Sequence, residues 1–145
     1  MPFLSIYIHI VWTTKNFTPL LPDKISREKL KHHILTNAKS KSIFINQLAI
    51  QKDHCHCLLS LSHDQNISKI VQLLKGESSR WLNSEQLLAH KFEWQKEYYA
   101  VSVSLSHKER VMEYIKNQDE HHRKKTFSEE YENFTRKYGF KKLDD

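Results

Sequence analysis

The chain has 145 residues, the length of a single ordinary domain, and we expect one domain over residues 1–145. Its formal net charge of +6 at pH 7 and its ten histidines predict a surface that attracts polyanions such as nucleic acid, although a basic surface without such a partner is the alternative. Because the chain has only two cysteines, no apolar run of 18 residues and no signal peptide, it resembles neither a disulfide-rich secreted protein nor a membrane protein, and we expect a cytoplasmic location without membrane contact.

The first predicted element is a strand over residues 3–14, where apolar and polar residues alternate. Alternation sends successive side chains to opposite faces of a sheet. One face would carry Leu4, Ile6, Ile8, Ile10 and Trp12, and the other would carry Ser5, Tyr7, His9 and Thr13. The strand is therefore expected to have one covered face.

Residues 24–40 are predicted to form a helix, with Asp23 as its N-cap, because Ile25, Leu30, Ile34 and Ala38 recur at roughly helical spacing. Two strands are predicted next, over 43–52 and 54–62, joined by a tight turn.

A second helix is predicted over residues 66–88, beginning at Asn66. Gly76 lies inside it and either bends the helix or allows a DNA backbone to approach closely.

A fourth strand is predicted over residues 98–105. Its two faces would carry Tyr99, Val101, Val103 and Leu105 on the core side, and Tyr98, Ala100, Ser102 and Ser104 on the other. A helix over 107–121 follows, opened by a capping box of Ser106 and Glu109, and a last helix is predicted over 128–138.

The order βαββαβ followed by helices predicts an α+β fold, a ferredoxin-like or RRM-like antiparallel sheet with the two crossover helices on one face. The strand over 54–62 would turn Cys55, Cys57, Leu59 and Leu61 toward those helices. His54 and His56 would then lie on the open face, together with His9, Tyr7 and Ser102.

The pair His54 and His56 carries the first chemical signal, because residues i and i+2 of a strand can offer two imidazole nitrogens to one metal ion. In the helix over 107–121, Tyr114 and Gln118 are four residues apart and share an edge. If that helix docks beside the histidine strand, Gln118 would complete the metal site and Tyr114 would lie next to it. A phenol has a pKa of about 10, so a nearby cation would favour its nucleophilic phenolate form.

Five segments, in this order, resemble the single-tyrosine HUH transposases of the insertion-sequence 200/605 group. They are IHIVWTTK, KDHCHCLLS, LKGESSRWLN, YIKNQDEHH and KKTFSEEYENFTRKYGF, which together span nearly the whole chain. The chain departs from the family pattern at Cys55, where the middle residue of the His-x-His motif is ordinarily large and apolar.

The resemblance implies that His54, His56 and Gln118 bind Mg²⁺ or Mn²⁺ and that Tyr114 attacks a DNA phosphate. The products would be a 5′-phosphotyrosine and a free 3′-OH, which can later be rejoined without ATP. It further implies single-stranded DNA with hairpin ends as the substrate, a homodimer as the assembly and a bacterial host.

Four basic side chains are further candidates for contacts with DNA, namely His9, Lys52, Lys75 and Arg80. His9 could instead support the metal-binding histidines from behind. A solvated, charged surface explains these residues equally well.

Three alternatives remain open from the residues themselves. The run HCHC could be a structural zinc site, although alternation directs its histidines and cysteines to opposite faces. The same fold serves non-catalytic modules that bind single-stranded nucleic acid, although these need exposed aromatic residues on the central strands. A domesticated relative that retains DNA nicking for a cellular task is the third.

Overall fold

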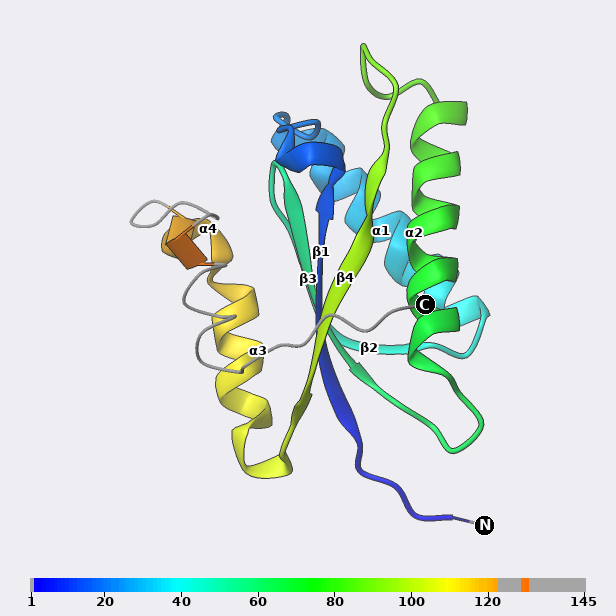
Figure 1. The fold of residues 1–145 in the computed structure, drawn as a ribbon, viewed down its shortest axis with the longest axis vertical. Coiled ribbons are helices and arrows are strands. Elements are labelled where there is room, and N and C mark those ends of the chain that lie inside the picture. Colours follow the sequence, from blue (N-terminus) through cyan, green and yellow to red (C-terminus); the bar gives the residue numbers. More distant parts are fainter. Residues whose placement is uncertain (1, 123–128, 131–145) are drawn as a thin grey trace.

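The computed structural model describes residues 2–122 and 129–130, and its elements follow the predicted order (Figure 1). They are β1 (Tyr7–Thr14), the 3-10 turn η1 (Lys15–Phe17), α1 (Lys24–Ser40), β2 (Phe44–Ile50), β3 (His54–Ser60), α2 (Ile67–Ser84), β4 (Trp94–Val103), the 3-10 turn η2 (Leu105–His107), α3 (Lys108–Lys116) and α4 (Gln118–His122). The helix predicted over 128–138 lies outside the described residues except for 129–130.

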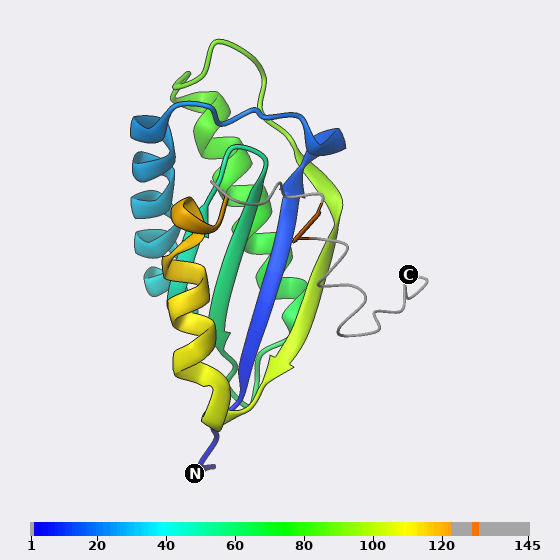
Figure 2. The ribbon, with the colours of Figure 1, turned by 90° about the vertical axis from the view of Figure 1, so that its left-hand side faces the viewer.

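The four strands form one antiparallel sheet in the order β2-β3-β1-β4, so β2 and β4 are its edges. The long helices α1 and α2 cover one face, whereas α3 lies across the other face, over β2 and β3 (Figures 1 and 2). This arrangement confirms the predicted α+β, ferredoxin-like fold. Among residues 2–122 and 129–130, the helices are too short or too polar to span a membrane.

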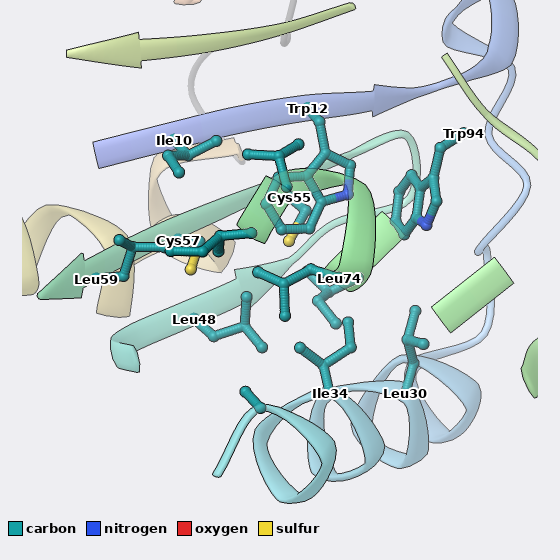
Figure 3. Close-up of a cluster of buried hydrophobic side chains, with 14 of the residues drawn as sticks. Ile10, Trp12, Leu30, Ile34, Leu48, Cys55, Cys57, Leu59, Leu74 and Trp94 are labelled. Carbon is teal, nitrogen blue, oxygen red and sulfur yellow. The ribbon is translucent and has the colours of Figure 1, made fainter. Parts of the chain in front are cut away.

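The hydrophobic core lies between the sheet and the two long helices, where Trp12, Cys55, Cys57 and Leu59 meet side chains of α1 and α2 (Figure 3). Helix α1 presents residues at intervals of four, including the fully buried Leu30, to this core. Complete burial of one such leucine stabilises the fold by about 1.5–3 kcal/mol. The predicted placement of both cysteines on the helix side of β3 is confirmed.

The N-cap of α1 was also predicted correctly. The carboxylate of Asp23 accepts hydrogen bonds from the backbone N–H groups of Ile25 and Ser26, at 3.2 and 3.3 Å. These bonds satisfy two of the amides that a helix leaves without a partner at its start.

The first strand begins later than its alternating pattern predicted. Leu4 and Ile6 precede β1 and are 48% and 40% exposed. Tyr7, the first residue of β1, lies opposite the last residues of β3 and β4. The residues before it therefore have no continuing strand beside them, and their apolar side chains are not covered.

The predicted face assignment of β4 is wrong. Ser102 lies opposite Ile8 and therefore faces the helices, whereas Val101 lies opposite His9 and faces the histidine side. Both faces of this edge strand carry apolar residues, so alternation alone could not distinguish them. The pairing with β1, which includes a register shift near the end of β1, decided the orientation.

The predicted capping box is also wrong. Ser106 lies within η2, and α3 begins after His107, which makes no side-chain capping bond. The hydroxyl of Ser104 instead lies 2.7 Å from Nδ1 of His107. The predicted helix over 107–121 is in fact two segments, because α3 ends before Asn117 and α4 follows.

Candidate metal and tyrosine site

His54 and His56 lie side by side on β3, on the sheet face opposite the long helices. The sequence predicted that this face is open, but α3 packs over β2 and β3 and covers it (Figure 2). His54 is 0% and His56 1% exposed. The two imidazoles are therefore shielded from solvent.

Each of the two imidazoles is oriented by a contact at its Nδ1. Nδ1 of His54 lies 2.7 Å from Oδ1 of Asp53, and Nδ1 of His56 lies 2.9 Å from Nε2 of His9. Such contacts hold a histidine ring in place while its other nitrogen binds a ligand. Both Nε2 atoms consequently point toward the same region, beneath α3.

A carboxylate occupies that region. Oε1 of Glu130 lies 2.9 Å from Nε2 of His56, and Oε2 lies 3.9 Å from Nε2 of His54. Glu130 is itself buried. Glu130 was not predicted as a site residue, because it lies far along the chain from the histidines and has no fixed spacing from them.

Tyr114, on α3, reaches the same carboxylate. Its hydroxyl donates a short hydrogen bond to Oε1 of Glu130. Its ring stands nearly perpendicular to that of His56, with the ring centroids 5.6 Å apart. The packing of α3 on the sheet therefore brings the phenol and the two histidines to one carboxylate, while the catalytic role of Tyr114 stays a prediction.

Gln118 is buried at the start of α4 and donates a hydrogen bond from Nε2 to the backbone carbonyl of Tyr114, at 3.2 Å. The neighbouring Asp119 accepts a hydrogen bond of 2.9 Å from Nε2 of Gln51, which follows β2. The first bond lies within the α3–α4 segment, and the second ties the start of α4 to the end of β2. The role of Gln118 as a metal ligand stays a prediction.

His9 lies beneath His56 rather than on an exposed surface, with 4% of its surface accessible. The two rings stack with their centroids 5.2 Å apart. Burial, followed by the neighbouring His56, lowers the pKa of His9 to about 3, so His9 is neutral at pH 7. His9 therefore supports the ring of His56. The contact of His9 with DNA stays a prediction.

The chemistry of the donor set fits a divalent cation. Within the described residues, one ligand atom from each of His54, His56 and Glu130 lies within 4.8 Å of the others, and all three residues are buried. Imidazole and carboxylate together suit ions such as Mn²⁺, whereas Mg²⁺ prefers oxygen ligands and retains water.

The structural zinc interpretation of HCHC is wrong, because Cys55 and Cys57 belong to the core on the opposite side of the sheet. Burial raises the pKa of Cys57 to about 12 and that of Cys55 well above its ordinary value. Without a metal, both are therefore neutral thiols at pH 7.

Of the three other basic candidates, only Lys52 is near a histidine along the chain, two residues before His54. Lys52 is exposed in the turn between β2 and β3. Lys75 and Arg80 belong to α2, on the opposite side of the sheet. Lys75 donates to three backbone carbonyls near the start of β4, at 2.5, 2.9 and 3.3 Å, and burial lowers its pKa to about 8. Arg80 pairs with Glu77 at 2.6 Å.

Comparison with known proteins agrees with the resemblance in the sequence. Residues 3–118 match the model of the family described as "Transposase IS200 like". The ISDra2 transposase TnpA of Deinococcus radiodurans is 26% identical over 116 residues, which cover 76% of this chain and 81% of the relative.

Two solved structures share the fold, each with a TM-score of 0.62. One, described as a transposase from Deinococcus radiodurans, is 24% identical, and the match covers 81% of this chain and 95% of that one. The other, a REP-associated tyrosine transposase bound to a REP hairpin, is 16% identical, with 84% and 74% covered. Since the family model spans most of the sequence and the fold agrees, the chain belongs to the IS200-like transposase family.

Proposed function

We propose that this transposase cleaves and rejoins single-stranded DNA through Tyr114, assisted by a divalent cation. One observation carries the proposal: the Tyr114 hydroxyl and Nε2 of His56 meet at the same carboxylate oxygen, Oε1 of Glu130. A nucleophile held beside a cation-binding group is the arrangement that phosphoryl transfer needs.

His54, His56 and Glu130 would hold the cation, Mn²⁺ or Mg²⁺. When bound, the cation supplies charge neutralisation at the phosphate and favours the phenolate form of a nearby tyrosine. Asp53 and His9 keep the two imidazoles oriented through their Nδ1 atoms. Gln118, one helical turn from Tyr114, is a candidate for a further ligand.

The proposed reaction begins with attack by the phenolic oxygen of Tyr114 on the phosphorus of a DNA phosphodiester. The phenolic proton passes to the carboxylate of Glu130, which already accepts the hydrogen bond. A tyrosine–phosphorus bond forms as the phosphorus–O3′ bond breaks, and the O3′ atom takes a proton from water. The products are a 5′-phosphotyrosine and a 3′-OH, and reversal of the step rejoins a strand without ATP.

The proposed substrate is a single strand that carries hairpins, and the proposed assembly is a homodimer. A structural neighbour is bound to a REP hairpin, and the net charge of +6 suits a polyanionic partner. A non-catalytic binding module is less well supported, since the central strand β3 presents buried histidines, not exposed aromatic residues, on that face.

The test is a denaturing gel with a labelled single-stranded hairpin from the DNA that flanks the gene, in the presence of Mn²⁺. The wild type should form a covalent protein–DNA adduct, and Tyr114→Phe should form none. Tyr7→Phe is the matched control, because it removes a hydroxyl from the same sheet face outside the site. Retardation of the strand by the wild type without any adduct would favour the binding module.

A further inference from the structure

A groove runs along the outer edge of the sheet, beside β2. Helix α1 contacts β2 from one face of the sheet and α3 contacts it from the other (Figure 2). Because β2 is an edge strand, the space between the two helices stays open, with a volume of about 180 Å³. Pockets for small molecules are larger, about 300–1,000 Å³. The groove is therefore better suited to an extended chain that lies in it than to an enclosed compound.

The walls of the groove are basic. Lys24, Arg27 and Lys31 line it from α1, and Lys116 lines it from α3. At 100° per residue the three α1 side chains fall within one 60° sector of the helix. Two acidic residues, Glu28 and Asp119, also line the groove, so four positive charges face two negative ones.

Most of these cations are available to a ligand. In the described part of the chain, Lys24, Lys31 and Lys116 form no salt bridge. Arg27 donates through Nη1 to the backbone carbonyl of Leu21 at 2.6 Å, which anchors its guanidinium at the groove and leaves its other N–H groups for a ligand.

The groove is also lined by close chain neighbours of Tyr114. Ile115 and Gln118 line the groove, and Gln118 donates a hydrogen bond to the backbone carbonyl of Tyr114. Along the other wall, Lys24 and Lys31 are separated by about 10 Å of helix, which matches about three stacked nucleotides at 3.4 Å each. A strand in the groove would thus run directly to the helix that carries the nucleophile.

We propose that this groove holds the sugar-phosphate backbone of the DNA single strand next to the phosphate that is cleaved. The inference rests on the proposed function and adds the path of the substrate to it. Lys24, Arg27, Lys31 and Lys116 contact successive phosphates, independently of base sequence. An acidic peptide that pairs with the edge of β2 is the competing occupant, and the absence of any effect on DNA binding would favour it.

The test compares two triple variants with the same change in charge. The groove variant carries Lys24→Gln, Lys31→Gln and Lys116→Gln. The matched control carries Lys29→Gln, Lys39→Gln and Lys41→Gln, which are exposed positions at α1 outside the groove. Circular dichroism and a thermal melt verify that both variants fold. Fluorescence anisotropy with a single-stranded oligonucleotide in EDTA then measures affinity at several salt concentrations, without cleavage.

The groove variant should bind the oligonucleotide at least about tenfold more weakly. The slope of log K against log[salt] should also fall in magnitude by about 2, because each of the three lost phosphate contacts contributes about 0.7. The control should lose much less. Equal losses in both variants would show that overall charge is responsible, and no loss in the groove variant would exclude DNA from the groove; either result overturns the proposal.

The adduct assay separates this inference from the proposed function. If the wild type forms the adduct but the groove variant binds DNA as tightly as the wild type, the groove proposal alone fails. If no adduct forms but the groove variant selectively loses affinity, the catalytic proposal fails and the DNA path stands.

Discussion

Glu130 is the residue at which the candidate site comes together, since it contacts both Tyr114 and His56. The His-x-His motif could be identified from the sequence because its spacing has a direct geometric meaning on a strand. Glu130 has no fixed spacing from either histidine. Its place in the site follows only from the packing of distant parts of the chain.

At the scale of this residue, Glu130→Gln should weaken the binding of Mn²⁺ at least about tenfold. The substitution keeps the size of the side chain but removes the negative charge that a cation needs. Isothermal titration of the metal-free protein with Mn²⁺ measures the effect.

Glu129→Gln is the matched control, because it removes the same charge from the exposed neighbour and should leave the affinity unchanged. Equal Mn²⁺ affinity in the wild type and Glu130→Gln would exclude Glu130 from the metal site.

Among the elements, helices and strands with one clear apolar face were the most predictable. The buried residues of α1 recur every four positions, and its Asp23 cap has a local chemical cause. The faces of β4 and the start of α3 were predicted wrongly. In both cases the outcome depends on a neighbour, either the pairing register with β1 or the turn that precedes the helix.

Helix α2 allows a test at the scale of one element. Gly76 is exposed inside this helix, and a Cβ atom added there would have no heavy atom within 4 Å beyond its chain neighbours and the helix's own nearby backbone. Gly76→Ala should therefore raise the free energy of unfolding by about 1 kcal/mol, since alanine loses less backbone entropy in a helix. Urea denaturation measures this change.

Oligonucleotide affinity distinguishes the two roles considered for this glycine. We expect no change in Gly76→Ala, as in the control Gln72→Ala at another exposed position of α2. A selective loss of affinity in Gly76→Ala would instead indicate that a DNA backbone approaches α2 closely.

The two faces of the sheet have different tasks in the whole molecule. One face packs against α1 and α2 to form the core, and the other carries the histidines beneath α3. The groove beside β2 connects the outside of the molecule with the tyrosine helix. Binding of DNA and chemistry at Tyr114 should therefore be separable.

Removal of divalent cations should abolish the covalent adduct but leave binding of the single strand largely intact. The proposed cation would act where His54, His56 and Glu130 meet, whereas lysine and arginine side chains would supply the sequence-independent affinity for DNA. Denaturing and native gels run in parallel, with and without EDTA, measure the two activities.

Restoration of the adduct by added Mn²⁺ is the control for irreversible damage by EDTA. An adduct that forms equally well in EDTA would contradict metal-assisted chemistry and leave Tyr114 to act with protein groups alone.

The sequence by itself determined the order of the elements, the family, and the separation of His54 and His56 from Cys55 and Cys57. These features follow from local backbone geometry, because a strand alternates its side chains whatever surrounds it. The tertiary structure alone decided that Glu130 joins the histidines, that His9 supports His56, and which face of β4 is buried. Each of these features depends on how separate segments dock and pair. The periodicity of apolar residues within a single segment does not contain that information.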